Sequence, residues 1–175
     1  MPRPGRRTTW VRFPGSSAEK AAALIEDGRL DAMLKERYAE KVLYKIKEKY
    51  PETVLIKAAD FNPDDFKRYD TIGFASGIFY FKFAKPVDRL FERALASGVQ
   101  KLFFIYTAGA VNAGFEKSLR SKTEQSGKIC MGIFGCKGFD TFGPLKLIGG
   151  LNKNRPNEED FKNAIDFFET SVLRR

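Results

Sequence analysis

The residue types that most often carry out chemistry in proteins are scarce in this chain. It has no histidine, which excludes Ser-His and Cys-His nucleophilic catalysis and removes the usual group for proton transfer near neutral pH. Its two cysteines, Cys130 and Cys136, form no CxxC pair, and without histidine they cannot supply an ordinary zinc or iron–sulfur site. We therefore predict no metal site and no catalytic side chain, so that any chemistry must come from a bound cofactor.

The same residue counts indicate the compartment. Two cysteines are too few for a disulfide framework, which favours a reducing environment. No apolar run approaches the roughly 18 residues of a membrane-spanning helix, and the first residues, MPRPGRRTTWVR, lack the apolar core of a secretory signal. We predict a cytoplasmic protein without a transmembrane segment.

The net charge of +9 is concentrated near the ends of the chain. Six of the nine excess positive charges correspond to Arg3, Arg6, Arg7, Arg12, Arg174 and Arg175. We interpret residues 1–7 as a flexible basic tail that favours solubility, in preference to an arm that binds nucleic acid or an acidic membrane. Nucleic acid is therefore not expected as a partner.

Strand patterns alternate with helical patterns along the chain. Strands are predicted at 8–13, 53–58, 70–76, 101–107 and 128–135, and helices at 17–50 with a break at Gly28, 85–98, 113–126 and 157–173. This alternation predicts one α/β domain over residues 1–175, with a parallel sheet covered on both faces. The segment 29–50 is an extra helical stretch, and its apolar stripe favours core packing over a lid or a dimer surface.

Two longer stretches resemble the flavodoxin family: YDTIGFASGIFYFKFAKPV at 69–87, and GCKGFDTFGPLKLIGGLNKNRPNEEDFKNAIDFFE at 135–169 with its GFDT-GP-KLIGG-RP motif. The resemblance spans roughly residues 53–172. It implies a flavodoxin-like three-layer sandwich with a five-stranded parallel sheet in the order 2-1-3-4-5. It also implies an FMN site where the strands end and the crossovers diverge, and hence a role in electron transfer or oxidoreduction.

In flavodoxins the loop after the first strand wraps the flavin phosphate with a pattern of the form S-x-T-G-N-T. The corresponding residues here are Gly15, Ser16 and Ser17, which keep a glycine, two hydroxyls and a helix start. The loop lacks T-G-N-T and places Glu19 near the expected phosphate. Phosphate binding and simple capping of the helix by a serine are equally compatible with this segment.

The second family loop corresponds to residues after the third strand, where aromatic side chains can stack on a flavin ring. The candidate ligands are Ser76, Gly77, Ile78, Phe79 and Tyr80. In the family, a glycine here lets a peptide turn its carbonyl toward flavin N5, and Gly77 is the matching residue. The alternative is that Phe79, Phe81 and Phe83 point inward as part of the core of an extended strand.

The third family loop follows the long apolar strand, and its counterparts here are Thr107, Ala108 and Gly109. Small residues permit close approach of a ring edge, but they also suit a plain strand-to-helix turn. Cys136 lies at the same predicted sheet edge, where it could border the flavin or order its own loop, and we favour a structural role for Asp140.

The altered phosphate loop motivates a second interpretation, a flavodoxin-like domain that no longer holds flavin and acts as a binding or scaffold module. If flavin is held, the basic chain predicts a redox partner with an acidic surface.

Overall fold

The computed structural model describes residues 8–12, 30–79, 81–139, 147 and 150–174. Several sequence-based predictions fall outside these residues: the basic tail 1–7, the first part of the helix predicted from Ser17, and the candidate residues Gly15, Ser16, Ser17, Tyr80 and Asp140.

A six-stranded sheet forms the centre of the fold. Five strands pair in parallel in the order β2-β1-β3-β5-β6, namely β1 (Thr8–Arg12), β2 (Val54–Lys57), β3 (Thr71–Phe79), β5 (Lys101–Ala108) and β6 (Ile129–Lys137). The sixth strand, β4 (Lys82–Phe83), pairs antiparallel with the end of β3. The predicted α/β class is confirmed, but the sheet is mixed and has one more strand than predicted.

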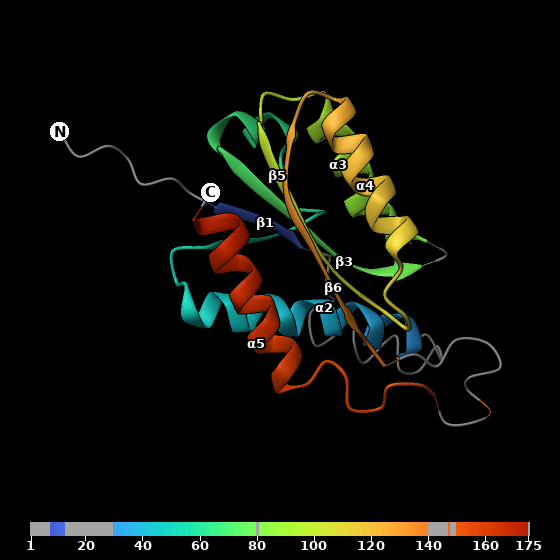
Figure 1. The fold of residues 1–175 in the computed structure, drawn as a ribbon. Helices are drawn as coiled ribbons and strands as arrows, with labels where there is room; N and C mark the ends of the chain where they lie inside the picture. The colour runs from blue at the N-terminus through green and yellow to red at the C-terminus, as the bar shows by residue number, and fades with distance from the viewer. Residues whose placement is uncertain (1–7, 13–29, 80, 140–146, 148–149, 175) are drawn as a thin grey trace.

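Helices cover both faces of this sheet (Figure 1). Helices α3 (Lys85–Leu95) and α4 (Ala113–Gln125) lie on one face. Helix α2 (Leu30–Lys49) and helix α5 (Glu158–Phe167) lie on the other, and α5 continues as the π-helical segment Phe168–Leu173. The alternation of strands and helices in the sequence therefore produces three layers.

The apolar residues of these elements form two clusters, one on each face of the sheet. Every residue from Leu102 to Tyr106 in β5 is fully buried, because helices cover both faces of this strand. In α2, Val42, Leu43 and Ile46 are buried against the sheet and α5. The core-packing interpretation of the apolar stripe in this helix is therefore confirmed for Val42 and Ile46.

Three glycines in the strands make room for aromatic rings. A Cβ atom on Gly73 would lie 2.2 Å from Cζ of Phe103, and one on Gly135 would lie 2.3 Å from Cζ of Tyr106. At Gly132 the nearest ring atom, on Phe167, would be 2.6 Å away. Real Cβ contacts are longer than this, so each ring occupies the space that a side chain would need.

The crossover from β2 to β3, residues 58–70, contains no α-helix. It contains one 3₁₀-helix, η1 (Pro63–Arg68), capped at its start by the side chain of Asn62, which accepts from the Asp64 amide at 3.1 Å. Parallel strands are more often joined through an α-helix. Phe61 and Phe66 anchor the crossover by packing in the core next to α3.

The segment after Ser76 differs from the open loop that the sequence predicted. β3 continues to Phe79 and turns into β4, with Ile78 opposite Phe83 and Phe79 opposite Lys82. The buried hydroxyl of Ser76 explains the hairpin, because it donates to the Gly77 carbonyl and accepts from the Ala84 amide at 3.2 Å. The inward-pointing interpretation is right for Phe83, which is buried, and wrong for Phe81, which is 70% exposed.

Candidate functional site

The carboxyl ends of β3, β5 and β6 meet in register at one edge of the sheet. Gly77 pairs with Thr107, and Thr107 pairs with Cys136. A small pocket lies just beyond this row. Its lining residues are Tyr38, Gly77, Ile78, Thr107, Ala108, Gly109, Gly138 and Phe139.

Five of the eleven predicted cofactor ligands therefore lie together: Gly77, Ile78, Thr107, Ala108 and Gly109. Ser76 is not among the lining residues, and its buried hydroxyl forms hydrogen bonds within the hairpin. Phe79 belongs to β3, and the remaining four predicted ligands lie outside the described residues. The predicted ligands at the carboxyl ends of β3 and β5 therefore lie close together in the structure.

Sequence reasoning did not assign Tyr38 to the site. This residue lies on α2, and burial raises its pKa above the ordinary tyrosine value. Lys41, on the same helix, places its ammonium 5.3 Å from the centre of the Tyr38 ring. Only the packing of α2 across the strand ends brings the ring to the pocket, and the sequence pattern gives no signal for that.

Close approach between β5 and the chain after β6 depends on Gly138. The Gly138 amide donates to the Ala108 carbonyl at 2.8 Å, and a Cβ atom here would lie 3.3 Å from Cβ of Thr107. A larger residue would have to displace Thr107 or narrow the pocket. The absence of a side chain at Gly138 therefore preserves both its hydrogen bond to Ala108 and the open space of the pocket.

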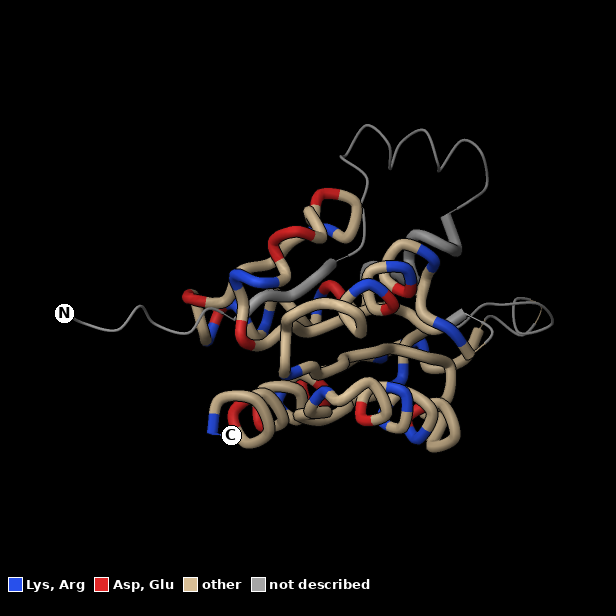
Figure 2. The backbone as a smooth tube through the Cα atoms, turned by 90° about the horizontal axis from the view of Figure 1, so that it is seen from above, with Lys and Arg blue, Asp and Glu red and all other residues tan. Residues whose placement is uncertain are grey.

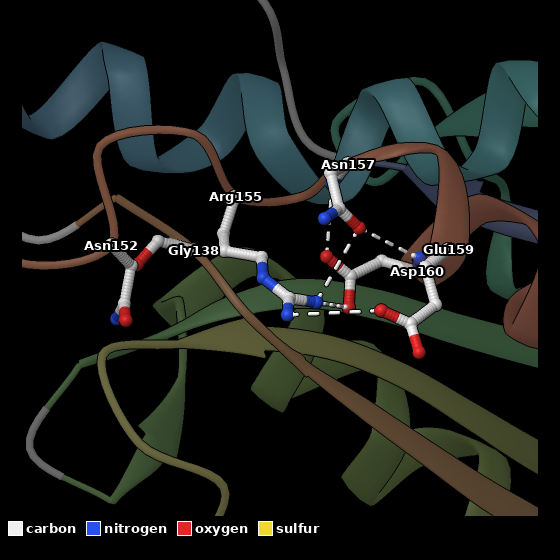
Figure 3. Close-up of polar contacts among 6 residues, drawn as sticks. All are labelled: Gly138, Asn152, Arg155, Asn157, Glu159 and Asp160. Carbon is white, nitrogen blue, oxygen red and sulfur yellow. Dashed lines mark hydrogen bonds and ion pairs between the residues drawn. The ribbon is translucent and has the colours of Figure 1, made fainter.

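Asn152 holds two of the pocket's backbone segments together. Its side-chain amide donates to the Gly109 carbonyl at 2.9 Å and to the Gly138 carbonyl at 3.3 Å. Figure 3 shows the Asn152 side chain beside the chain at Gly138. The backbone of Asn152 has φ of 58°, a left-handed conformation that asparagine adopts more readily than most residues. This conformation and the two donated bonds fix the loop that leads into α5.

A charge cluster anchors the same loop to the start of α5 (Figure 3). Arg155 Nη1 lies 2.8 Å from Oδ1 of Asp160, and Arg155 Nη2 lies 3.9 Å from Oε2 of Glu159. The other Asp160 oxygen accepts from the Asn157 amide at 2.9 Å, while Oδ1 of Asn157 accepts from the Asp160 amide at 3.1 Å. These reciprocal bonds form a capping box that fixes where the helix begins. The Arg155 carbonyl also accepts from the Phe139 amide at 3.2 Å, which connects the cluster to the pocket.

Cys136 has a structural position rather than a reactive one. It is 4% exposed, and burial raises the pKa of its thiol to about 12, with a further increase from the charge of Asp160 and an opposing effect of Arg155. A thiol with this pKa stays protonated at neutral pH and is a poor nucleophile. Burial also raises the pKa of the Cys130 thiol, and both cysteines are free.

The pocket is too small to enclose a flat aromatic ring. Its volume is about 20 Å³, whereas pockets that enclose small molecules usually measure roughly 300–1,000 Å³. The lining includes three glycines, which carry no side chain, together with the hydroxyl residue Thr107 and the aromatic residues Tyr38 and Phe139. These groups suit the polar edge and the π faces of a flavin ring. The predicted phosphate loop at residues 15–17 lies outside the described residues.

Among the described residues, no helix combines the length and the apolar character needed to cross a membrane. No group of three or more Asp, Glu and Cys side chains is arranged among them so that it could hold a metal ion.

The chain is similar to one curated protein and to solved flavodoxin structures. It is 41% identical over 115 residues to uncharacterized protein MJ0298 of Methanocaldococcus jannaschii, an alignment that covers 65% of this chain and 75% of that protein. No known family profile matches the sequence.

Among solved structures, a flavodoxin from the domain Archaea superposes with a TM-score of 0.52 at 17% identity, covering 93% of this chain and 96% of that one. The two-electron reduced flavodoxin of Megasphaera elsdenii gives a TM-score of 0.53 at 14% identity, covering 90% and 97%. At these identities the likeness shows the fold. The resemblance to flavodoxins is confirmed at that level, and the chain belongs to the family of the Methanocaldococcus protein.

Proposed function

We propose that this chain binds a flavin, specifically FMN, at the carboxyl ends of β3, β5 and β6 and takes part in electron transfer or oxidoreduction. The observation that carries the proposal is the convergence of Gly77, Thr107 and Gly109 in one pocket. The pocket lies at the carboxyl edge of a sheet whose crossovers diverge between β1 and β3, which is where doubly wound α/β proteins bind ligands. The flavodoxins with the same fold support a flavin in preference to other ligands.

When bound, FMN supplies the capacity to accept and release one or two electrons. The residues of this chain would hold and orient it. The Thr107 hydroxyl and the backbone at Gly77 and Gly109 would meet the ring edge, and Tyr38 and Phe139 would limit the access of water to that edge. The candidate phosphate ligands remain Gly15, Ser16 and Ser17, and Ser76, Phe79 and Tyr80 remain candidate ligands near the ring.

The hairpin adds a constraint on Gly77. The Ser76 hydroxyl donates to the Gly77 carbonyl, and Gly77 pairs with Thr107 within the sheet. A peptide turn of the kind expected from the flavodoxin resemblance would have to break the bond from Ser76. We propose that Ser76 therefore helps to set the orientation of this peptide.

The partner that exchanges electrons with the protein is proposed to present acidic surface, and the compartment is proposed to be the cytoplasm, where the free cysteines would stay reduced. Along the described backbone, positions of Lys and Arg are interspersed with positions of Asp and Glu (Figure 2). This mixture favours a local contact over the continuous basic surface typical of nucleic-acid binding.

The test is reconstitution of the purified full chain with FMN and, in parallel, with riboflavin. We expect quenching of flavin fluorescence and an induced visible circular dichroism signal, with FMN bound at least about tenfold more tightly than riboflavin if charge-assisted bonds hold the phosphate. A chain that binds neither compound would refute the proposal and favour the scaffold interpretation. Equal affinity for both would refute the choice of FMN while preserving a flavin site.

A matched pair of variants localises the binding. Ala108→Leu adds volume at a pocket residue, whereas Ala113→Leu makes the same change at an exposed position at the start of α4. We expect the first variant to weaken flavin binding at least about tenfold and the second to leave it unchanged. Melting temperatures of both variants separate lost binding from lost folding.

A further inference from the structure

A second and much larger hollow lies away from the pocket, between α3 and the crossover from β2 to β3. It measures about 490 Å³, and its lining residues are Ala58, Phe61, Pro63, Pro86, Arg89, Leu90, Glu92 and Arg93. Ala58, Phe61 and Leu90 are each only 6% exposed, so the floor is apolar and continuous with the core. We call this hollow the α3 groove.

The crossover that borders the α3 groove contains no α-helix. Residues 58–70 cross from β2 to β3 with the six-residue η1 where many parallel connections carry a full α-helix. Pro86, Arg89, Leu90 and Arg93 line the groove from α3 at the spacing of one helix face. The groove therefore follows α3 for about two turns, or roughly 10 Å.

The residues that line the α3 groove include two arginines and one glutamate, which gives the lining a net positive charge. Arg89 and Arg93 are exposed and form no ion pair with any acid in the described part of the chain. Glu92 is already paired with Lys122 of α4. The two guanidinium groups thus stand one turn apart beside an apolar floor, each with free donors for a carboxylate.

We infer that the α3 groove is a docking site for an acidic amphipathic helix of a partner protein. Apolar side chains of that helix would pack on Phe61, Leu90 and Ala58, and two carboxylates one turn apart would pair with Arg89 and Arg93. The partner helix would occupy the position beside α3 that the crossover leaves uncovered. This docking does not require a flavin, so it can be tested separately from the proposed function.

The probe is a fluorescein-labelled peptide of about 15 residues, near the shortest length at which an isolated helix forms in water, with leucines on one face and glutamates beside them. Fluorescence anisotropy of this peptide is measured against the full chain, with and without added FMN. A second peptide has lysine in place of every glutamate. We expect the acidic peptide to bind in both conditions and the basic peptide not to bind.

Two double variants carry the same change in net charge. The variant with Arg89→Glu and Arg93→Glu reverses the charge of the groove at these two positions. The variant with Lys117→Glu and Arg120→Glu makes the same change of charge at exposed positions of α4 outside the groove. We expect the first variant to bind the acidic peptide at least about tenfold more weakly than the wild-type chain does, and to bind the basic peptide. The second should change neither affinity by more than about twofold, because attraction to net charge alone is weak and screened by salt. Circular dichroism of each variant verifies its folding.

Three results would overturn the inference. The acidic peptide could fail to bind the wild-type chain, or both double variants could weaken it equally, which would indicate attraction to net charge alone. A small aromatic carboxylate such as benzoate could instead bind in a manner that depends on Arg89 and Arg93 while the peptide does not, which would make the groove a small-molecule site.

Discussion

The two bonds donated by Asn152 give a prediction whose size follows from the structure. In the Asn152→Asp variant the side chain keeps its shape and much of its tolerance for the left-handed backbone, but it has no N–H to donate. The Gly109 and Gly138 carbonyls would then face a carboxylate instead of an amide. Both partners are carbonyls, so only the amide nitrogen of asparagine can serve them.

The expected loss of stability comes from two neutral hydrogen bonds, of which the one to Gly138 is the longer. Each contributes about 0.5–1.5 kcal/mol net, so the free energy of unfolding should fall by roughly 1–3 kcal/mol. For a chain of this size, each kcal/mol corresponds to a shift of roughly 2–4 °C in the melting temperature. Thermal and guanidinium unfolding measure the loss, and hydrogen exchange at the amides of Gly109 and Gly138 shows whether the loop opens locally.

Asn154 offers the control, because it is exposed and its side chain donates no hydrogen bond within the described residues. The Asn154→Asp variant makes the same chemical change two residues away and should leave stability within about 0.5 kcal/mol of wild type. If Asn152→Asp is as stable as Asn154→Asp, the bridge between the two carbonyls contributes nothing and the reasoning fails. If hydrogen exchange rises across the whole chain instead of near the pocket, the role of Asn152 is global rather than local.

Further predictions concern the packing at Gly135 and the thiol of Cys136. The free energy of unfolding of the Gly135→Ala variant should fall by roughly 1–3 kcal/mol, because its Cβ would overlap the fully buried ring of Tyr106. The Gly98→Ala control meets no atom within 4 Å, so equal stability of the two variants in chemical denaturation would contradict the clash. The Cys136 thiol, with its pKa raised to about 12, should resist alkylation in the folded protein at pH 8 and react after unfolding. The folded state holds this proton more tightly than the unfolded state does. The free energy of unfolding should therefore decline as the pH rises from the ordinary thiol pKa of 9.0 toward 12. The Cys136→Ala variant, which lacks the thiol, should show a shallower decline.

Local patterns were sufficient to predict most of the secondary structure. The stretch KLFFIYT is apolar at nearly every position, and it became β5, covered on both faces. The helix predicted at 157–173 corresponds to α5 and its continuation, and a capping box at Asn157 fixes its start. These features depend on residues close together in the chain, which is why sequence alone could locate them.

The errors arose where distant contacts decide the structure. The stretch after Ser76 has the glycine and aromatic residues of a loop, but pairing with β4 and the bonds of the Ser76 hydroxyl make it a hairpin. Tyr38 reaches the pocket only because α2 packs across the strand ends, and Asn152 acts on carbonyls that lie 43 and 14 residues away in sequence. No periodic pattern reports such contacts.

The glycines that accommodate rings in the sheet have an evolutionary consequence. Because Phe103 fills the space above Gly73, neither residue can change size alone without a clash or a void. Among related sequences, an alanine at the position of Gly73 should therefore occur together with a smaller side chain at the position of Phe103, and the same coupled exchange should relate Gly132 to Phe167. Homologues of this protein should preserve the combined volume of each pair more faithfully than the identity of either member.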